Sequence, residues 1–292
     1  MEAHEHLFLH LLGLGEAAAA RASLREASRL ARELRQPPQL WSAAVDEALL
    51  ALLEGRFGEA ERLIEETAAL ADMAPRWNAR MSYRLQLYLL RRAQGRLELV
   101  RGRLERLDEL VDYRTYPIFD CVLARLYDEV GRKSDAHDIF ERLAADDFAA
   151  IPFDEEWLVS MGFLAEVAHS LGDRPRSEVM YERLAPYTDH VAVAYPEIST
   201  GSVARNLGLL AATLSRWGDA ERHFEVALTM NERIGARPWL AHTQEDYAHL
   251  LRGLRRPGAD EQAQGLLDGA LEIYRELGMD SHAARISAGG FS

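Results

Sequence analysis

Two groups of titratable residues are spaced so that their side chains can act together. The first group consists of Glu2, His6 and His10. The second group, within about two helical turns, consists of His242, Glu245, Asp246 and His249. On a helix, residues three or four apart lie on the same face. Imidazoles and carboxylates that face one another can bind a divalent metal ion or act in general acid–base catalysis.

Other signs of catalysis or metal binding are weak. Phe8 stands where an H-E-x-x-H zinc motif needs its second histidine, so we interpret the N-terminal group as a solvated helix face. Cys121 is the only cysteine, which excludes an intramolecular disulfide and zinc sites with several cysteines, and we expect it to be an inert, at least half-buried thiol. Neither a G-x-S-x-G nucleophile motif nor a phosphate-binding G-x-x-x-x-G-K-[ST] loop is present. We therefore expect no enzyme, no cofactor and no metal.

The charge balance restricts the possible partners. The chain has 292 residues, with 34 Lys and Arg against 47 Asp and Glu, which gives a formal net charge of −13. This charge argues against direct binding of nucleic acid or of an anionic membrane, because both require a basic surface. The arginine-rich third unit consists of Arg91, Arg92, Arg96, Arg101, Arg103 and Arg106, interleaved with acidic residues, and we interpret it as a solvated face with salt bridges.

The overall composition predicts a soluble, folded protein. Hydrophobic residues make up 48%, which is enough for a full core. No apolar run approaches the length of about 18 residues that a spanning helix needs. The N-terminus has no basic region ahead of an apolar stretch, so we expect a cytoplasmic protein.

One short pattern recurs seven times and predicts the elements that position these side chains. A Gly or small residue is followed five positions later by a second small residue and then, four further on, by an apolar one. The second small residue falls at positions 20, 60, 100, 136, 177, 220 and 263, with spacings of 40, 40, 36, 41, 43 and 43. The Gly permits a tight turn, and the small residue lets two helices approach closely. The pattern predicts an all-α chain of helical hairpins over residues 2–34, 39–72, 76–111, 116–145, 155–185, 200–234 and 238–278.

The sixth unit resembles the tetratricopeptide repeat (TPR), whose signature is W-x₂-L-G…A-x₃-F. Leu207-Gly208 precedes the turn in this unit, and Ala220 and Phe224 follow it. The period near 40 is similar to that of MalT-like regulators. The segments 144–148, 192–201, 207–212 and 235–239 are similar to the C-terminal TPR region of bacterial signalling proteins. Those proteins join a cyclase or LuxR-type output domain to an ATPase.

The resemblance implies a fold and a class of function. The fold would be a right-handed superhelical TPR-like solenoid of about seven hairpins over residues 1–279. We expect the tail at 280–292 to be a helix start followed by a frayed Gly-Gly end. The function would be that of a regulatory or sensing module of a bacterial signal-transduction or transcription-regulatory ATPase or cyclase. Whether the chain is a stand-alone relative or a C-terminal module of such a protein remains open.

In TPR arrays the first helix of each unit lines a concave groove, and this suggests the binding residues. We expect a protein or peptide to bind in the groove at Arg125, Asp128, Glu166, His169, Arg205, Thr213, His242, Glu245, His249 and Arg252. The alternative is a small-molecule sensor whose groove closes over a metabolite. The N-terminal groove is apolar, at Val45, Leu49, Leu52, Leu85 and Leu89. It should be covered by a partner, by a second copy in a homo-oligomer, or by the curl of the array.

The connection 186–200 is unusually long for a helical array. It contains Val191, Val193, Tyr195 and Ile198, whose side chains lose free energy in water, so we expect an ordered, packed segment. The segment is either a brace between the fifth and sixth units or a lid over the groove.

Overall fold

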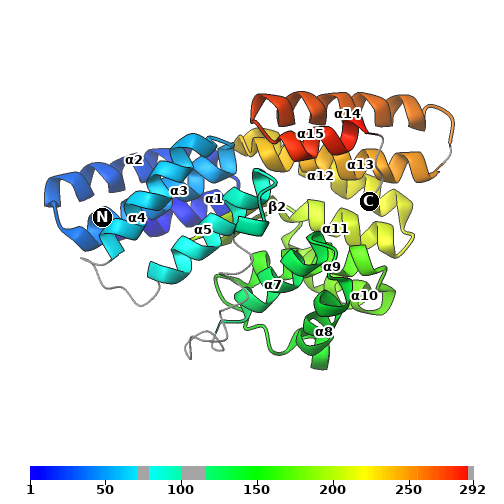
Figure 1. The fold of residues 1–292 in the computed structure, drawn as a ribbon, viewed down its shortest axis with the longest axis horizontal. Coiled ribbons are helices and arrows are strands. Elements are labelled where there is room, and N and C mark those ends of the chain that lie inside the picture. The colour runs from blue at the N-terminus through cyan, green and yellow to red at the C-terminus, as the bar shows by residue number, and fades with distance from the viewer. Residues whose placement is uncertain (72–78, 100–115, 255, 289–292) are drawn as a thin grey trace.

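The computed structural model describes residues 1–71, 79–99, 116–254 and 256–288, and these are the residues considered below (Figure 1). The N-terminal helices are α1 (Glu2–Gly13), α2 (Ala17–Leu34), α3 (Pro37–Glu54), α4 (Phe57–Ala71) and α5 (Ala79–Ala93). The middle helices are α7 (Pro117–Glu129), α8 (Lys133–Ala144), α9 (Trp157–Leu171) and α10 (Arg174–Leu184). The C-terminal helices are α11 (Val203–Thr213), α12 (Trp217–Ile234), α13 (Arg237–Leu254), α14 (Ala259–Glu276) and α15 (Asp280–Ser287).

Consecutive helices pack as antiparallel pairs, which confirms the predicted helical hairpins. A turn with a residue of positive φ joins the two helices of a pair. Gly55 has φ 81° and ends α3, and in the sixth unit Ser215 adopts φ 63° in the same place. These angles belong to the left-handed region that Gly enters without steric cost, whereas Ser is strained there. The Gly or small residue of the recurring pattern is therefore required by the backbone conformation of the turn.

The small residues of the pattern mark the closest helix contacts. Ala60, Ala136 and Ala220 are completely buried. Within the same contacts, a Cβ added at Gly208 of α11 would lie 2.7 Å from the ring of Phe224 on α12. Position 100 lies outside the described residues. The small residues thus allow the two helices of a hairpin to touch.

A two-stranded antiparallel sheet interrupts the helices and corrects the all-α prediction. It consists of β1 (Val191–Ala194) and β2 (Ile198–Ser202). The β-branched residues Val191, Val193 and Ile198 favour strands. The sheet is mostly buried and contacts α1, α3, α5, α9, α12 and α13. The prediction that the segment 186–200 is ordered and packed is confirmed. The sheet contacts more units than the fifth and sixth, which the predicted brace would join, and the choice between brace and lid stays a prediction.

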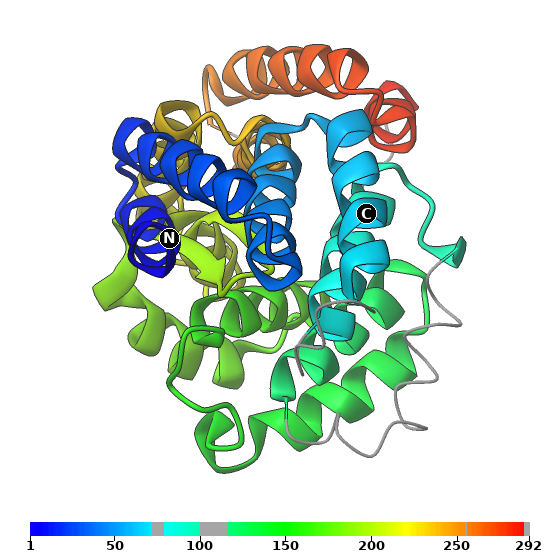
Figure 2. The same ribbon diagram turned by 90° about the vertical axis from the view of Figure 1, so that its left-hand side faces the viewer.

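The N-terminal hairpins lie against the C-terminal ones. Helix α3 contacts α13, and Arg21 of α2 donates a hydrogen bond to the carbonyl oxygen of Ile234 at 2.7 Å. A Cβ at Gly55 would lie 2.8 Å from Leu277, beside α15 (red in Figure 2). The predicted apolar groove positions Leu49 and Leu85 are buried by the chain's own elements. The apolar N-terminal groove is therefore covered by the chain's own fold, so it needs neither a partner nor a second copy.

The C-terminal segment contains the helix start expected for residues 280–292. Residues 280–287 form helix α15, in which His282 and Ala283 are buried against the body of the protein. Short polar helices of this kind depend on tertiary contacts, which the local sequence does not reveal. Residues 289–292 lie outside the described part. Within the described residues, no helix combines the length and apolar character needed to cross a membrane.

Candidate functional site

Three arginines from three different helices converge on the carboxylate of Glu166 in α9. Arg125 of α7 donates to Glu166 Oε2 at 2.5 Å, and Arg205 of α11 donates to Glu166 Oε1 at 2.8 Å. Arg92 of α5 also donates to Glu166 Oε2. The side chains of Arg92, Glu166 and Arg205 are 7%, 5% and 8% exposed. Charges at this depth require partners, and here each has one.

Further carboxylates complete this network, which we name the charged centre. Arg92 pairs with Glu129 at 2.8 Å, and Arg205 pairs with Asp246 of α13 at 2.7 Å. Arg125 pairs with Asp128 at 2.7 Å. The charged centre thus consists of Arg92, Arg125, Asp128, Glu129, Glu166, Arg205 and Asp246. It connects α5, α7, α9, α11 and α13, the first helices of five successive units.

The protonation states in the charged centre follow from burial and neighbouring charge. Burial alone would raise the pKa of Glu166, but the guanidiniums of Arg92, Arg205 and Arg125 hold that pKa well below its usual value. Burial raises the pKa of Asp246, and Arg205 opposes this effect only in part. Glu166 is therefore the permanent anion at the middle of the network.

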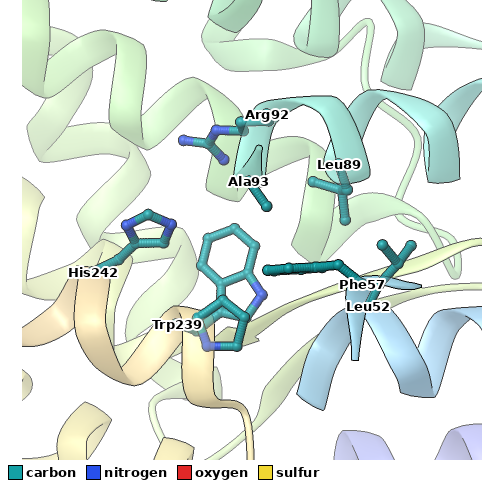
Figure 3. A pocket seen from close by; sticks show the side chains of 8 residues that line it. Leu52, Phe57, Leu89, Arg92, Ala93, Trp239 and His242 are labelled. Carbon is teal, nitrogen blue, oxygen red and sulfur yellow. The ribbon is translucent and has the colours of Figure 1, made fainter. Parts of the chain in front are cut away.

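A small cavity lies beside the charged centre (Figure 3). The indole of Trp239 lies between His242 and Phe57, and Arg92 lies above it in this view. The Cζ atoms of Arg92 and Arg205 each lie 5.7 Å from the centroid of the Trp239 ring, which is within cation–π distance. The cavity has a volume of about 20 Å³. This is room for a single water molecule and not for a metabolite.

A second polar group adjoins the cavity, and we name it the His–Tyr–Glu cluster: His242, Glu245, Tyr274, His282 and Arg285. The Tyr274 hydroxyl lies 2.7 Å from His242 Nδ1 and donates to Glu245 Oε2 at 2.8 Å. Arg285 donates to both oxygens of Glu245, at 3.0 and 2.8 Å. Burial lowers the pKa of His282 to about 4 and that of His242 well below its usual value. Both imidazoles are neutral near pH 7.

Solvent-exposed groups lie at the carboxyl-terminal ends of α9 and α11, next to the charged centre. His169 Nδ1 lies 2.9 Å from the Thr213 hydroxyl. Ser170 donates to Asp128 of the charged centre at 2.8 Å, and Lys133 contacts both of these residues at 2.5 Å. We name Lys133, His169, Ser170 and Thr213 the polar rim. It joins three successive units at the surface.

The structure distributes the predicted groove residues among three places. Arg125, Asp128, Glu166 and Arg205 meet in the charged centre, His169 and Thr213 meet in the polar rim, and His242 and Glu245 belong to the His–Tyr–Glu cluster. The other two residues lie further along α13. Arg252 donates to Gln264 of α14 at 3.1 Å, and His249 is half-buried on α13.

Sequence reasoning missed several members of these groups. Arg92 was interpreted as part of a solvated face, but it is buried, since α5 turns this residue toward α9. Arg91 is half-buried and pairs with Glu61 at 2.6 Å, and positions 101, 103 and 106 lie outside the described residues. His282 and Arg285 lie far along the chain from His242, so no local spacing reveals them. Cys121 is buried, as expected, and burial raises the pKa of its thiol.

The comparisons with known proteins add no relative. A scan against protein-family models finds no match, and no curated protein matches the sequence. What the sequence and the structure establish together is a mostly helical protein of consecutive antiparallel pairs, consistent with a helical repeat.

Proposed function

We propose that the chain is a non-enzymatic scaffold that binds a protein or peptide at the polar rim. The observation that carries this proposal is the joining of three units at the surface by Lys133, His169, Ser170 and Thr213, directly beside a rigid charged centre. A partner that contacts this rim meets side chains from α8, α9 and α11 at once. Binding residues presented by rigid elements favour specific recognition.

The charged centre supports this function by holding the helices that carry the polar rim in fixed positions. Buried ion pairs contribute little net stability compared with apolar packing of the same volume, but they allow few alternative arrangements. Here the network fixes five helices relative to Glu166, so the rim keeps one geometry. Arg is suited to this position because its planar guanidinium is always charged and presents several donors.

The regulatory role rests on the resemblance to TPR regions of bacterial signalling proteins. On that basis we propose a sensing or interaction module of an ATPase or cyclase pathway, with a right-handed superhelical path of the hairpins. The apolar positions that suggested a homo-oligomer are buried by the chain itself, so they no longer favour a second copy. The cavity beside Trp239 holds about one water molecule and does not support the small-molecule alternative. An open pocket of about 350 Å³ between α4 and α5, lined by Glu61, Tyr83 and Arg91 among others, has room for a metabolite and is the observation that keeps this alternative.

The test is affinity capture from a native lysate with three forms of the protein. The forms are the wild type, a rim variant with His169→Ala and Lys133→Ala, and a control with Arg222→Ala on the exposed face of α12. Arg222 is 63% exposed and pairs only with Asp219 of its own helix among the ion pairs of the described residues. We expect a partner that the wild type and the control retain and the rim variant loses. The same captured proteins in all three samples would overturn the proposal.

A further inference from the structure

Three potential metal ligands meet where α13 and α15 pack together. His242 and Glu245 are three residues apart on α13 and so project from one face, and His282 comes from α15. One ligand atom from each of the three lies within 4.8 Å of the others. Glu245 and His282 are buried and His242 is half-buried. Two imidazoles and one carboxylate form a donor set that suits zinc, nickel and related ions.

A cation from the chain itself already occupies part of this space. The Arg285 guanidinium binds both oxygens of Glu245, and its Nη2 lies 3.2 Å from His282 Nδ1. Since Arg can only donate, His282 Nδ1 accepts here and holds a lone pair directed at the cation. The other ring nitrogen, Nε2, then carries the proton and faces the carbonyl oxygen of Arg92 at 3.4 Å. Arg285 is 38% exposed, so its side chain can move into solvent.

We propose that His242, Glu245 and His282 bind one divalent transition-metal ion, which takes the place of the Arg285 guanidinium. Ligand atoms around a tetrahedral zinc ion lie about 3.4 Å apart, given metal–nitrogen distances near 2.0–2.1 Å. Since the three atoms lie within 4.8 Å of one another, they need to approach by at most about 1.4 Å, which requires side-chain rotations. The cavity that His242 lines has room for a water molecule as a further ligand.

One feature of the surroundings orients a ligand. The Tyr274 hydroxyl holds the Glu245 carboxylate from the side at 2.8 Å. Hydrogen bonds of this kind orient a metal-binding carboxylate. The ion would join α15 to α13 and, through the His282–Arg92 contact, to α5.

The competition between Arg285 and the ion gives the proposal a sharp test. Zinc affinity is measured by competition with a chromogenic chelator, and cobalt binding by its visible absorption, for the wild type, Arg285→Met, His282→Ala and His137→Ala. We expect Arg285→Met to bind at least about tenfold more tightly than the wild type and His282→Ala at least about tenfold more weakly. His137 is an exposed histidine of α8 outside the three ligands, so His137→Ala should bind as the wild type does.

A second readout does not depend on any variant. Zinc should raise the melting temperature of the wild-type protein and slow amide hydrogen exchange in α15, because the ion stabilises only the folded state. The proposal is overturned if Arg285→Met binds no more tightly than the wild type. It is also overturned if His282→Ala and His137→Ala bind zinc equally, or if zinc leaves exchange in α15 unchanged.

Discussion

Replacing Glu166 by Gln removes the one anion on which Arg92, Arg125 and Arg205 converge. The amide has nearly the shape of the carboxylate, so packing is retained while the charge is lost. The three guanidiniums then lie in a buried site without their common partner. Breaking a buried, hydrogen-bonded ion pair in this way typically costs about 3–5 kcal/mol. Because each arginine keeps a second carboxylate, we expect the lower end, about 3 kcal/mol.

The same substitution should change how stability depends on pH. The pKa of Glu166 is lowered in the folded state, so its contribution to the free energy of unfolding is fully present above the unfolded value, about 4.3. It is lost as the pH falls through the folded-state pKa. The Gln variant has no group to protonate at this position. The stability gap between wild type and variant should therefore be largest near neutral pH and narrow below about pH 4.

Urea denaturation at pH 7 and at pH 3.5 measures both effects. Glu141→Gln is the matched control, since Glu141 pairs with Arg176 at 2.7 Å but both side chains are 38% exposed. An exposed pair of this kind is worth about 0–1 kcal/mol. A cost for Glu166→Gln no larger than that of the control, or a gap that stays constant on acidification, would refute the reasoning.

Three further predictions concern packing, each checked by thermal unfolding. Gly208→Ala should lower the free energy of unfolding by about 1–3 kcal/mol, because its Cβ would overlap the Phe224 ring. Gly218→Ala, whose Cβ would have nothing within 4 Å, should raise the free energy of unfolding by up to about 1 kcal/mol. A shift of the melting temperature in the same direction for both variants would contradict the contact assigned to Gly208. Ala220→Arg should lower the free energy of unfolding by about 3 kcal/mol or more, since it places a charge in a fully buried helix contact. If this variant melts at the same temperature as the wild type, the assigned repeat register is wrong. Replacing residues 189–195 by a Gly-Ser stretch should lower the melting temperature because it removes β1, and unchanged melting would rule out a brace.

The helical hairpins could be predicted because their signals are local. A Gly at the turn and a small residue five positions later describe contacts between neighbouring helices, and Ala60 and Ala136 are buried as this pattern requires. Ser215 shows that the turn geometry persists even where Gly is absent. Likewise, the placement of Arg125, Glu166 and Arg205 on corresponding first helices predicted that these residues lie on one side of the array.

The remaining features depend on contacts that are distant in sequence. The burial of Arg92 depends on α9, more than seventy residues away in sequence. The role of His282 arises from the docking of α15, whose short polar sequence predicts a helix start but not what that helix packs against. The strands that contain Val191 and Ile198 have a local signal in their β-branched residues, but the burial of the sheet among six helices does not follow from it. No local periodicity carries such information.

Site-specific photo-crosslinking tests the central claim most directly, because it reports which surface touches a partner. A photoreactive amino acid is introduced at position 169 in the polar rim or, as the control, at position 222 on the exposed face of α12. After irradiation in cells, we predict a covalent adduct with a discrete partner protein from position 169 and none from position 222. An adduct from position 222 with no adduct from position 169 would contradict a binding function at the rim.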